Sequence, residues 1–174
     1  MDAIIDYINK SMDALGFYGP QMLFISTIFL LLHKKTYLTI YLIGFGINII
    51  LNTILKEIIK QPRPKEDKRL FHLQVLFGKH IGYDRYGMPS GHSQTSFFST
   101  LFVYLVLKDK RIAFIYLLSS FITMYQRVNS YSHTVQQVCI GAIIGSLIAF
   151  IMFRYGKNIL KGNPLMKLDD MAPI

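Results

Sequence analysis

One part of this chain reads Tyr86-Gly87-Met88-Pro89-Ser90-Gly91-His92-Ser93-Gln94, and a long apolar segment begins directly after it. A helix that starts here would present free backbone N–H groups and the positive end of its dipole, which together bind anions. Ser90 can cap such a helix and donate a hydrogen bond, and Gly91 lets an anion approach the backbone. His92, in the first turn, can hand a proton to a leaving group. The stretch therefore predicts an anion site at a helix start.

The composition of the 174-residue chain is typical of a membrane protein with several spans. Apolar residues make up 52%, the mean hydropathy is +0.35, and the charged residues, 17% of the chain, cluster between apolar runs. The net charge of +9 arises in short loops, so membrane topology or an anionic substrate explains it better than nucleic acid does. The one cysteine, Cys139, lies inside an apolar segment and excludes an intrachain disulfide.

Five apolar segments predict an all-α fold, a polytopic helical bundle with about five transmembrane helices. They run from about 17 to 32, 37 to 55, 93 to 107, 112 to 125 and 135 to 153. A bilayer crossing takes about 20 residues, so the short third and fourth segments must have their polar ends inside the protein. Gly44, Gly46, Gly141 and Gly145 permit close approach between helices. We expect a transmembrane bundle over 17–155.

The two ends of the chain differ from this bundle. Residues 3–15 alternate apolar and charged faces at helical spacing, which predicts an interfacial amphipathic helix over 1–16. Gly16 and the Gly19-Pro20 pair are expected to end it. The tail after Arg154, 156–174 above all, is polar, and we expect it to be flexible.

The only long connection in the sequence runs from about 60 to 89 and contains prolines, glycines and charges of both signs. A loop of this length in so small a protein is usually functional or a lid, so we interpret 60–89 as an active-site loop. Its histidines, His72 and His80, are expected to be solvated.

Five crossings would place the hairpin loops 33–35 and 108–111 on the same membrane side as the tail. That side carries nine of the 19 Lys and Arg residues, and the other side carries ten, so counting alone does not orient the chain. Several of the ten have a better explanation as anion ligands, given below. Discounting these makes the hairpin side cytoplasmic.

Two more basic clusters resemble parts of an anion site. Lys56 stands at the end of the second segment, and Arg63 follows after six residues, between Pro62 and Pro64, which stop the helix and stiffen the chain. An arginine offers a planar fork for phosphate oxygens and a lysine offers a point charge.

The third cluster lies between the fourth and fifth segments, where five residues separate Arg127 from His133. Gln137 follows His133 by one helical turn, so its side chain can reach the imidazole.

Alternation of the five spans puts all three clusters on one side of the membrane. Lys56, Arg63 and Arg127 would then surround an anion together with two histidines. These groups could catalyse phosphoryl transfer: the cations would stabilise the phosphate oxygens, one histidine would attack in line, and the other would protonate the leaving oxygen. No Cys/His/Asp cluster has metal-ligand spacing, so no metal or cofactor is expected.

The order Lys-(six)-Arg-Pro, Pro-Ser-Gly-His and Arg-(five)-His resembles the signature of the type 2 phosphatidic acid phosphatase and haloperoxidase superfamily. The resemblance implies a single membrane phosphatase domain over 1–174. It implies His133 as the nucleophile that forms a phosphohistidine, and His92 as the general acid. The implied phosphate-binding residues are Lys56, Arg63, Ser90, Gly91 and Arg127.

The chain departs from the family pattern at two positions. Gln126 precedes Arg127 where the family usually has serine, and Gln137 stands where an acidic residue usually orients the nucleophile. A neutral amide can fix the imidazole tautomer but cannot stabilise an imidazolium as a carboxylate does. The flanks of His92 and His133, and Gln61-Pro62-Arg63-Pro64, are most similar to the dolichyldiphosphatase branch, which tolerates this glutamine. The departure at Gln137 is therefore interpreted as a subfamily trait.

The resemblance implies an integral membrane phosphatase for a lipid phosphate or diphosphate, with a polyprenyl diphosphate favoured. Its apolar tail would enter laterally from the membrane lipids, on the lumenal or extracytoplasmic side, in the endoplasmic reticulum if the chain is eukaryotic or viral. Three alternatives remain: a phosphatase for phosphatidate or another lipid phosphate, a vanadate haloperoxidase, and an inactive lipid-binding homologue. The membrane spans argue against the haloperoxidase, and the intact basic and histidine residues argue against the inactive homologue.

Overall fold

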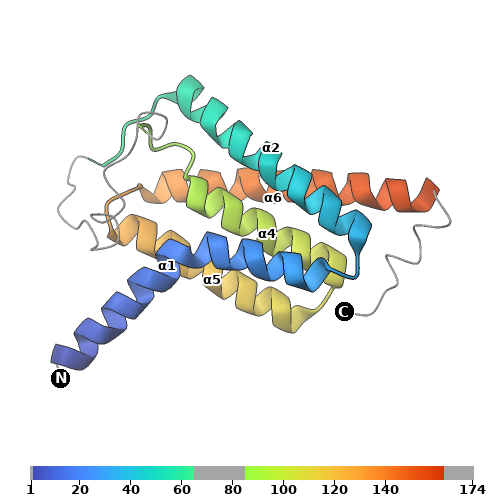
Figure 1. Cartoon of the computed structure of the whole chain (residues 1–174). Helices are drawn as coiled ribbons and strands as arrows, with labels where there is room; N and C mark the ends of the chain where they lie inside the picture. The colour runs from blue at the N-terminus through green and yellow to red at the C-terminus, as the bar shows by residue number, and fades with distance from the viewer. Residues whose placement is uncertain (1, 65–84, 163–174) are drawn as a thin grey trace.

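A computed structural model describes residues 2–64 and 85–162, and within these residues all regular structure is helical. The helices are α1 (Asp2–Leu31), α2 (Lys35–Ile59), α4 (Gly91–Leu107), α5 (Lys110–Asn129) and α6 (Val135–Gly162) (Figure 1). The all-α membrane bundle predicted from the sequence is confirmed. The predicted active-site loop over 60–89 lies outside the described residues at 65–84, which include His72 and His80, as does the tail after Gly162.

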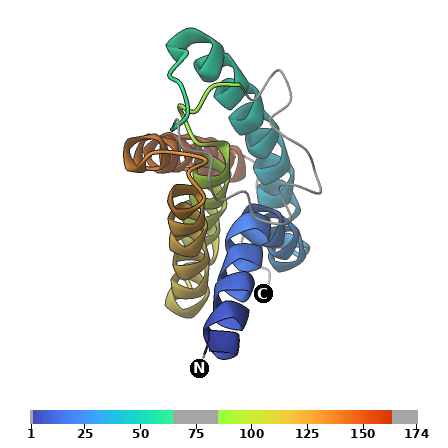
Figure 2. The ribbon, with the colours of Figure 1, turned by 90° about the vertical axis from the view of Figure 1, so that its left-hand side faces the viewer.

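Helix α4 forms the centre of the bundle and packs against α1, α2, α5 and α6. Figure 2 looks at the bundle from one end and shows the other helices grouped around α4. Phe98, Phe102 and Val103 on α4 are fully buried, and Tyr41 of α2 stacks on Phe98 at 5.5 Å between ring centroids. Because the neighbouring helices surround α4, the bundle accommodates a central helix of 17 residues, which is shorter than a usual membrane span.

Among the helices that the structure describes, three contain segments long and apolar enough to cross a membrane: Lys10–Leu31, Lys35–Ile59 and Val135–Lys161. α4 has only 17 residues, below the usual length of a span, and α5 is the least apolar of the five described helices. Many of their polar residues are buried against neighbouring helices, although Lys110 and Arg111 at the start of α5 are exposed. For example, the Thr100 hydroxyl of α4 lies 2.8 Å from the Ser120 hydroxyl of α5.

The prediction that Gly16 and Gly19-Pro20 end an interfacial helix was wrong, because α1 continues through them to Leu31. The glycines permit close packing instead. A Cβ on Gly16 would collide with the Gln126 side chain, and one on Gly19 with the Thr123 hydroxyl. Pro20 lies inside the helix, where a proline kinks the axis, and the N-terminal part of α1 leaves the bundle at an angle (Figure 1).

The glycines of α6 bring this helix against the start of α4. A Cβ on Gly145 would collide with the Gln94 carbonyl, and one on Gly141 would lie 2.5 Å from the Ser90 carbonyl oxygen. Gly44 likewise meets Met152 and Phe98, but Gly46 has nothing within 4 Å of its Cβ position, so its predicted packing role was wrong. The sequence predicted a flexible tail after Arg154, but α6 continues to Gly162, so this prediction was wrong for 155–162. Gly156 and Leu160 lie on the side of α6 that packs against the bundle.

The helix ends sort into two groups at opposite ends of the bundle (Figure 1). The α1–α2 and α4–α5 connections and the C-terminal end of α6 lie at one end. The last turn of α2, the first turn of α4 and the α5–α6 connection lie at the other. Residues distant in sequence therefore meet at this second end.

Candidate functional site

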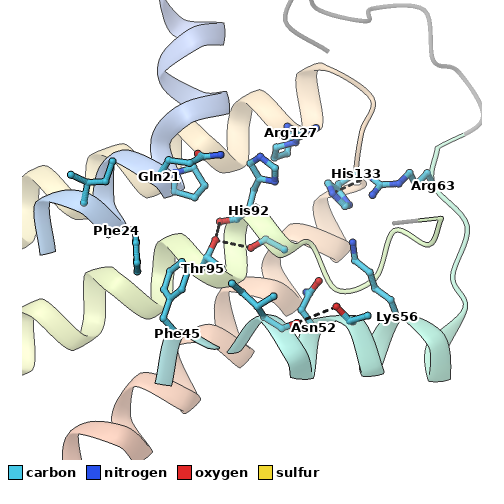
Figure 3. A pocket seen from close by; sticks show the side chains of 15 residues that line it. Gln21, Phe24, Phe45, Asn52, Lys56, Arg63, His92, Thr95, Arg127 and His133 are labelled. Atoms are coloured by element: carbon cyan, nitrogen blue, oxygen red, sulfur yellow. Dashed lines mark hydrogen bonds between the residues drawn. The ribbon is translucent and has the colours of Figure 1, made fainter. Parts of the chain in front are cut away.

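A cavity of about 580 Å³ opens at this second end, between α1, α2, α4 and the α5–α6 connection. Six of the residues singled out from the sequence line it: Lys56, Arg63, Gly91, His92, Arg127 and His133. Figure 3 shows Lys56 pointing from α2 toward His133, with Arg63 beside the imidazole. Ser90 and Gln137 are fully buried behind this wall.

The end of α2 fixes the two residues of the first cluster. Lys60 takes a left-handed conformation, with φ 51°, and its N–H donates to the Lys56 carbonyl at 2.9 Å, which ends the helix. The chain then turns back, and Arg63 Nη1 donates to the Ser132 carbonyl at 2.7 Å. Lys56 is itself buried, so the two cations are held at the cavity wall from two directions.

His133 has a hydrogen-bond partner on each ring nitrogen. Nδ1 lies 2.9 Å from the Gly87 carbonyl oxygen and 3.3 Å from Gln137 Oε1, and Nε2 lies 3.1 Å from Arg63 Nη1. Because a carbonyl only accepts, Nδ1 carries the proton, and the lone pair on Nε2 accepts from Arg63. The tautomer with a nucleophilic Nε2 is thereby selected.

The surroundings of His133 keep its ring neutral. Burial lowers the pKa of His133 well below its usual value, and the positive charges of Arg63, Arg127 and Lys56 and the neighbouring His92 lower this pKa further. The site therefore combines a neutral imidazole with an excess of positive charge, an arrangement suited to an anionic substrate.

His92 and Arg127 share a contact with α1. The Phe17 ring lies 5.8 Å from the His92 ring, between centroids, and Arg127 Cζ lies 5.8 Å from the Phe17 ring centroid. This is cation–π distance, so Phe17 supports both groups. The sequence alone gave no sign that α1 would take part in the site.

The second cluster differs in detail from what its sequence predicts. α4 begins at Gly91 and Ser90 occupies the N-cap position, but the Ser90 side chain makes no capping hydrogen bond. The Ser90 N–H donates to the Gln137 carbonyl at 3.1 Å, so this donor is engaged within the protein. Gly91 borders the cavity, whereas a phosphate contact from Ser90 stays a prediction.

A buried amide network beneath the cavity escaped the sequence analysis. Asn52 Nδ2 donates to the Pro89 carbonyl at 3.2 Å and to Gln94 Oε1 at 2.8 Å, and Gln94 Nε2 donates to Asn48 Oδ1 at 2.9 Å. The network ties α2 to the first turn of α4 and so places His92 relative to Lys56. A signal was present, because Asn48, Asn52 and Lys56 recur every four residues within an apolar helix.

An apolar wall of the cavity comes from α1 and α2, through Phe24, Ile25, Phe45 and Ile49, with Gln21, Thr53 and Thr95 at its edges. Within 2–64 and 85–162, no three His, Cys, Asp or Glu side chains gather where they could hold a metal ion. The site thus places cations and imidazoles at one end of an apolar pocket, a geometry that fits the phosphate group of an amphipathic molecule.

Known proteins resemble this chain in sequence and in fold. The model of the PAP2 superfamily matches residues 37–161. Dolichyldiphosphatase 1 of Plecturocebus moloch is 31% identical over 160 residues, which cover 82% of this chain and 63% of that protein. Dolichyldiphosphatase of Saccharomyces cerevisiae is 34% identical over 130 residues, covering 64% of this chain and 49% of that protein. The chain thus spans less than two thirds of the length of these relatives.

Among solved structures, the fold is similar to that of a transmembrane PAP2-type phosphatidylglycerolphosphate phosphatase from Bacillus subtilis. The TM-score is 0.67 at 22% sequence identity, with 88% of this chain and 78% of the other covered. At this identity the likeness establishes a shared helical architecture.

Proposed function

Because the chain belongs to the PAP2 superfamily, we propose that it is a membrane enzyme that hydrolyses a lipid phosphate, with a polyprenyl diphosphate as the favoured substrate. One observation carries the proposal: a single cavity joins Lys56, Arg63, Arg127 and two histidines to an apolar wall. The polar end suits the head group, and the apolar wall suits the first part of the tail.

The reaction proceeds in two transfers. Nε2 of His133 attacks the terminal phosphorus, the bond from phosphorus to the bridging oxygen breaks, and His92 gives its proton to the departing lipid monophosphate. Water then attacks the phosphohistidine, His92 accepts a proton from that water, and inorganic phosphate leaves. The hydrogen bond from Nδ1 to the Gly87 carbonyl keeps the ring proton on Nδ1 in both transfers, so that Nε2 is the atom that forms and later breaks the bond to phosphorus.

Positive charge stabilises the transferring phosphoryl group. Lys56, Arg63 and Arg127 neutralise its oxygens, and the N-terminus of α4 at Gly91 adds backbone N–H groups. Without substrate, Arg63 donates to the Nε2 lone pair. A bound phosphate would accept this donation instead and so free the lone pair for attack.

One further observation favours a lipid over a soluble phosphate, and a second favours a polyprenyl diphosphate among the lipids. The apolar wall lies between α1 and α2, two helices that face the membrane with many exposed apolar side chains, so a tail can leave the cavity sideways into the bilayer. The curated relatives are named dolichyldiphosphatases.

The cavity lies opposite the basic hairpin loops, which places it on the lumenal or extracytoplasmic side if the hairpins are cytoplasmic.

Purified protein in detergent tests the proposal through phosphate release from a polyprenyl diphosphate, a polyprenyl monophosphate and phosphatidate. We expect the diphosphate to give the highest kcat/KM and EDTA to leave it unchanged, because the described charges can act without a metal. His133→Ala should reduce turnover to background. His33→Ala, an exposed histidine in the α1–α2 hairpin, is the matched control and should retain full activity.

One result would contradict the function, and another would contradict the mechanism. Binding of lipid phosphate by the unaltered protein without turnover would favour a binding protein. Turnover that survives His133→Ala would refute the phosphohistidine mechanism. Bromide oxidation with added vanadate checks the haloperoxidase alternative.

A further inference from the structure

Gln137 is fully buried in the first turn of α6 and uses every polar atom of its side chain. Its Nε2 donates to Gln61 Oε1 and to the Pro62 carbonyl, both at 2.9 Å. Its Oε1 accepts from the Thr134 N–H at 3.2 Å and lies 3.3 Å from His133 Nδ1. The amide therefore joins the segment after α2 to the start of α6.

Backbone partners fix which way this amide points. The Pro62 carbonyl can only accept, so the atom beside it must be the NH₂ group. The Thr134 N–H can only donate, so the atom beside it must be the oxygen. The orientation thus follows from obligatory donors and acceptors and needs no choice between amide flips.

This one amide supports both partners of the nucleophilic imidazole. On one side, Gln61 and Pro62 directly precede Arg63, whose Nη1 lies 3.1 Å from His133 Nε2. On the other side, Gly87 packs directly on the amide, since a Cβ on Gly87 would lie 2.5 Å from Gln137 Oε1.

Gly87 is also held by the same segment and serves the imidazole directly. Its N–H donates to the Gln61 carbonyl at 2.8 Å, and its carbonyl accepts from His133 Nδ1 at 2.9 Å. The nearer acceptor for the His133 Nδ1 proton is thus the Gly87 carbonyl, at 2.9 Å against 3.3 Å for Gln137 Oε1. Orienting the imidazole is therefore not the main role of the Gln137 side chain.

We propose that Gln137 is a positioning residue that acts through its NH₂ group, which clamps Gln61 and Pro62 and thereby holds Arg63 and Gly87 on the two sides of His133. The orienting acceptor in this chain is the Gly87 carbonyl. A carboxylate at position 137 cannot donate to Gln61 and Pro62, so the glutamine is required here. The inference rests on the proposed phosphatase function for its kinetic readout only.

Gln137→Glu is the decisive substitution because it keeps the shape, replaces the NH₂ donors with an acceptor and adds one negative charge, for which a control is available. The clamp predicts that kcat/KM falls about 10- to 100-fold, since both donors are lost and the part-buried Pro62 carbonyl, which cannot turn away as the Gln61 amide can, is left facing a carboxylate. A glutamine that merely orients His133 would predict equal or higher activity, because a carboxylate stabilises an imidazolium. Gln136→Glu adds the same charge at the exposed neighbouring position and should leave kcat/KM unchanged.

The pH profile separates the clamp from a general loss of packing. A protonated carboxyl can again donate to the Pro62 carbonyl, so the activity of Gln137→Glu relative to the unaltered protein should rise as the pH falls. Titratable and charged groups reach this region from the segment after α2, from α2, α4 and α5, and from the α5–α6 connection. They are Arg63, Lys56, His92, Arg127 and His133.

A binding measurement keeps the test independent of turnover. Orthovanadate, a phosphate analogue, should bind Gln137→Glu at least about tenfold more weakly than it binds Gln136→Glu, because Arg63 is no longer held. No phosphate release by the unaltered protein would refute the function but leave this comparison informative. Equal vanadate affinity in the two variants, or a Gln137→Glu variant as active as the unaltered protein, would overturn the clamp.

Discussion

Replacing Gly145 with alanine should separate α4 from α6, and replacing Gly46 should not. The new Cβ at position 145 would collide with the Gln94 carbonyl oxygen and would lie 2.8 Å from its carbon and 3.1 Å from the Gln94 Cα. Carbon atoms pack at about 3.5–4.0 Å, so the two backbones must move apart by about 1 Å. Backbone atoms cannot rotate away as the tip of a side chain can.

The magnitude follows from two opposing terms. Alanine in place of a mid-helix glycine gains up to about 1 kcal/mol of helix propensity at either position. Overpacking costs about 1–3 kcal/mol at position 145 only, and lengthening the 3.1 Å hydrogen bond from Ser90 N to the Gln137 carbonyl adds about 1 kcal/mol. The two variants should therefore differ by about 3 kcal/mol in the free energy of unfolding.

Thermal unfolding of both variants in the same detergent measures this difference. For a chain of this size, 3 kcal/mol corresponds to a gap of about 6–12 °C in Tm, with Gly145→Ala the lower. Gly46→Ala should match or exceed the unaltered protein. Equal Tm values for the two variants would refute the close contact between α4 and α6. Phosphate release at a temperature where both are folded would then show whether the displacement of α4 reaches His92.

Other substitutions and conditions test the site itself. Arg63→Gln removes a charge that lowers the pKa of His133, so the acid limb of kcat/KM against pH should move to higher pH; an unmoved limb would contradict this coupling. The folded pKa of His133 lies below the unfolded value of about 6.5, so phosphate-free protein should keep its full stability above that pH and lose stability as the pH falls, seen as a falling Tm. Phe17→Ala should lower kcat/KM about two- to fivefold through its contact with Arg127, and Phe17→Leu, which also lacks the aromatic face, should not restore it.

The sequence predicted the features that depend on local chemistry. Apolar segments gave the helical bundle, and Pro62 and Pro64 marked the end of α2. Alternation of spans brought Lys56 and Arg127 to one end, and both line one cavity. These predictions hold because hydrophobic length and proline geometry act within a few residues of the chain.

Other features depend on the contacts that a residue makes with another helix. For these, glycine content and polarity along the sequence led to wrong predictions. Gly16 and Gly19 indicate a helix end by propensity, yet they lie in a continuous helix because α5 packs against them. The polar region after Arg154 is typical of a free tail, yet Leu160 is buried and the helix continues to Gly162. A glycine contributes to packing only through its neighbour, which a sequence does not name.

The stretch from Tyr86 to Gln94 illustrates both levels. Its residues alone predicted a helix start at Gly91 with His92 in the first turn, because the change from a Gly- and Pro-containing stretch to an apolar run is a local signal. Three contacts of this stretch come from the folded bundle: the Gly87 carbonyl accepts from His133, the Ser90 N–H donates to the Gln137 carbonyl, and Phe17 packs against His92. Each of these contacts joins groups that lie far apart in the sequence. A pattern of residues along the chain does not give the distance in space between such groups, so these contacts could not be predicted from it.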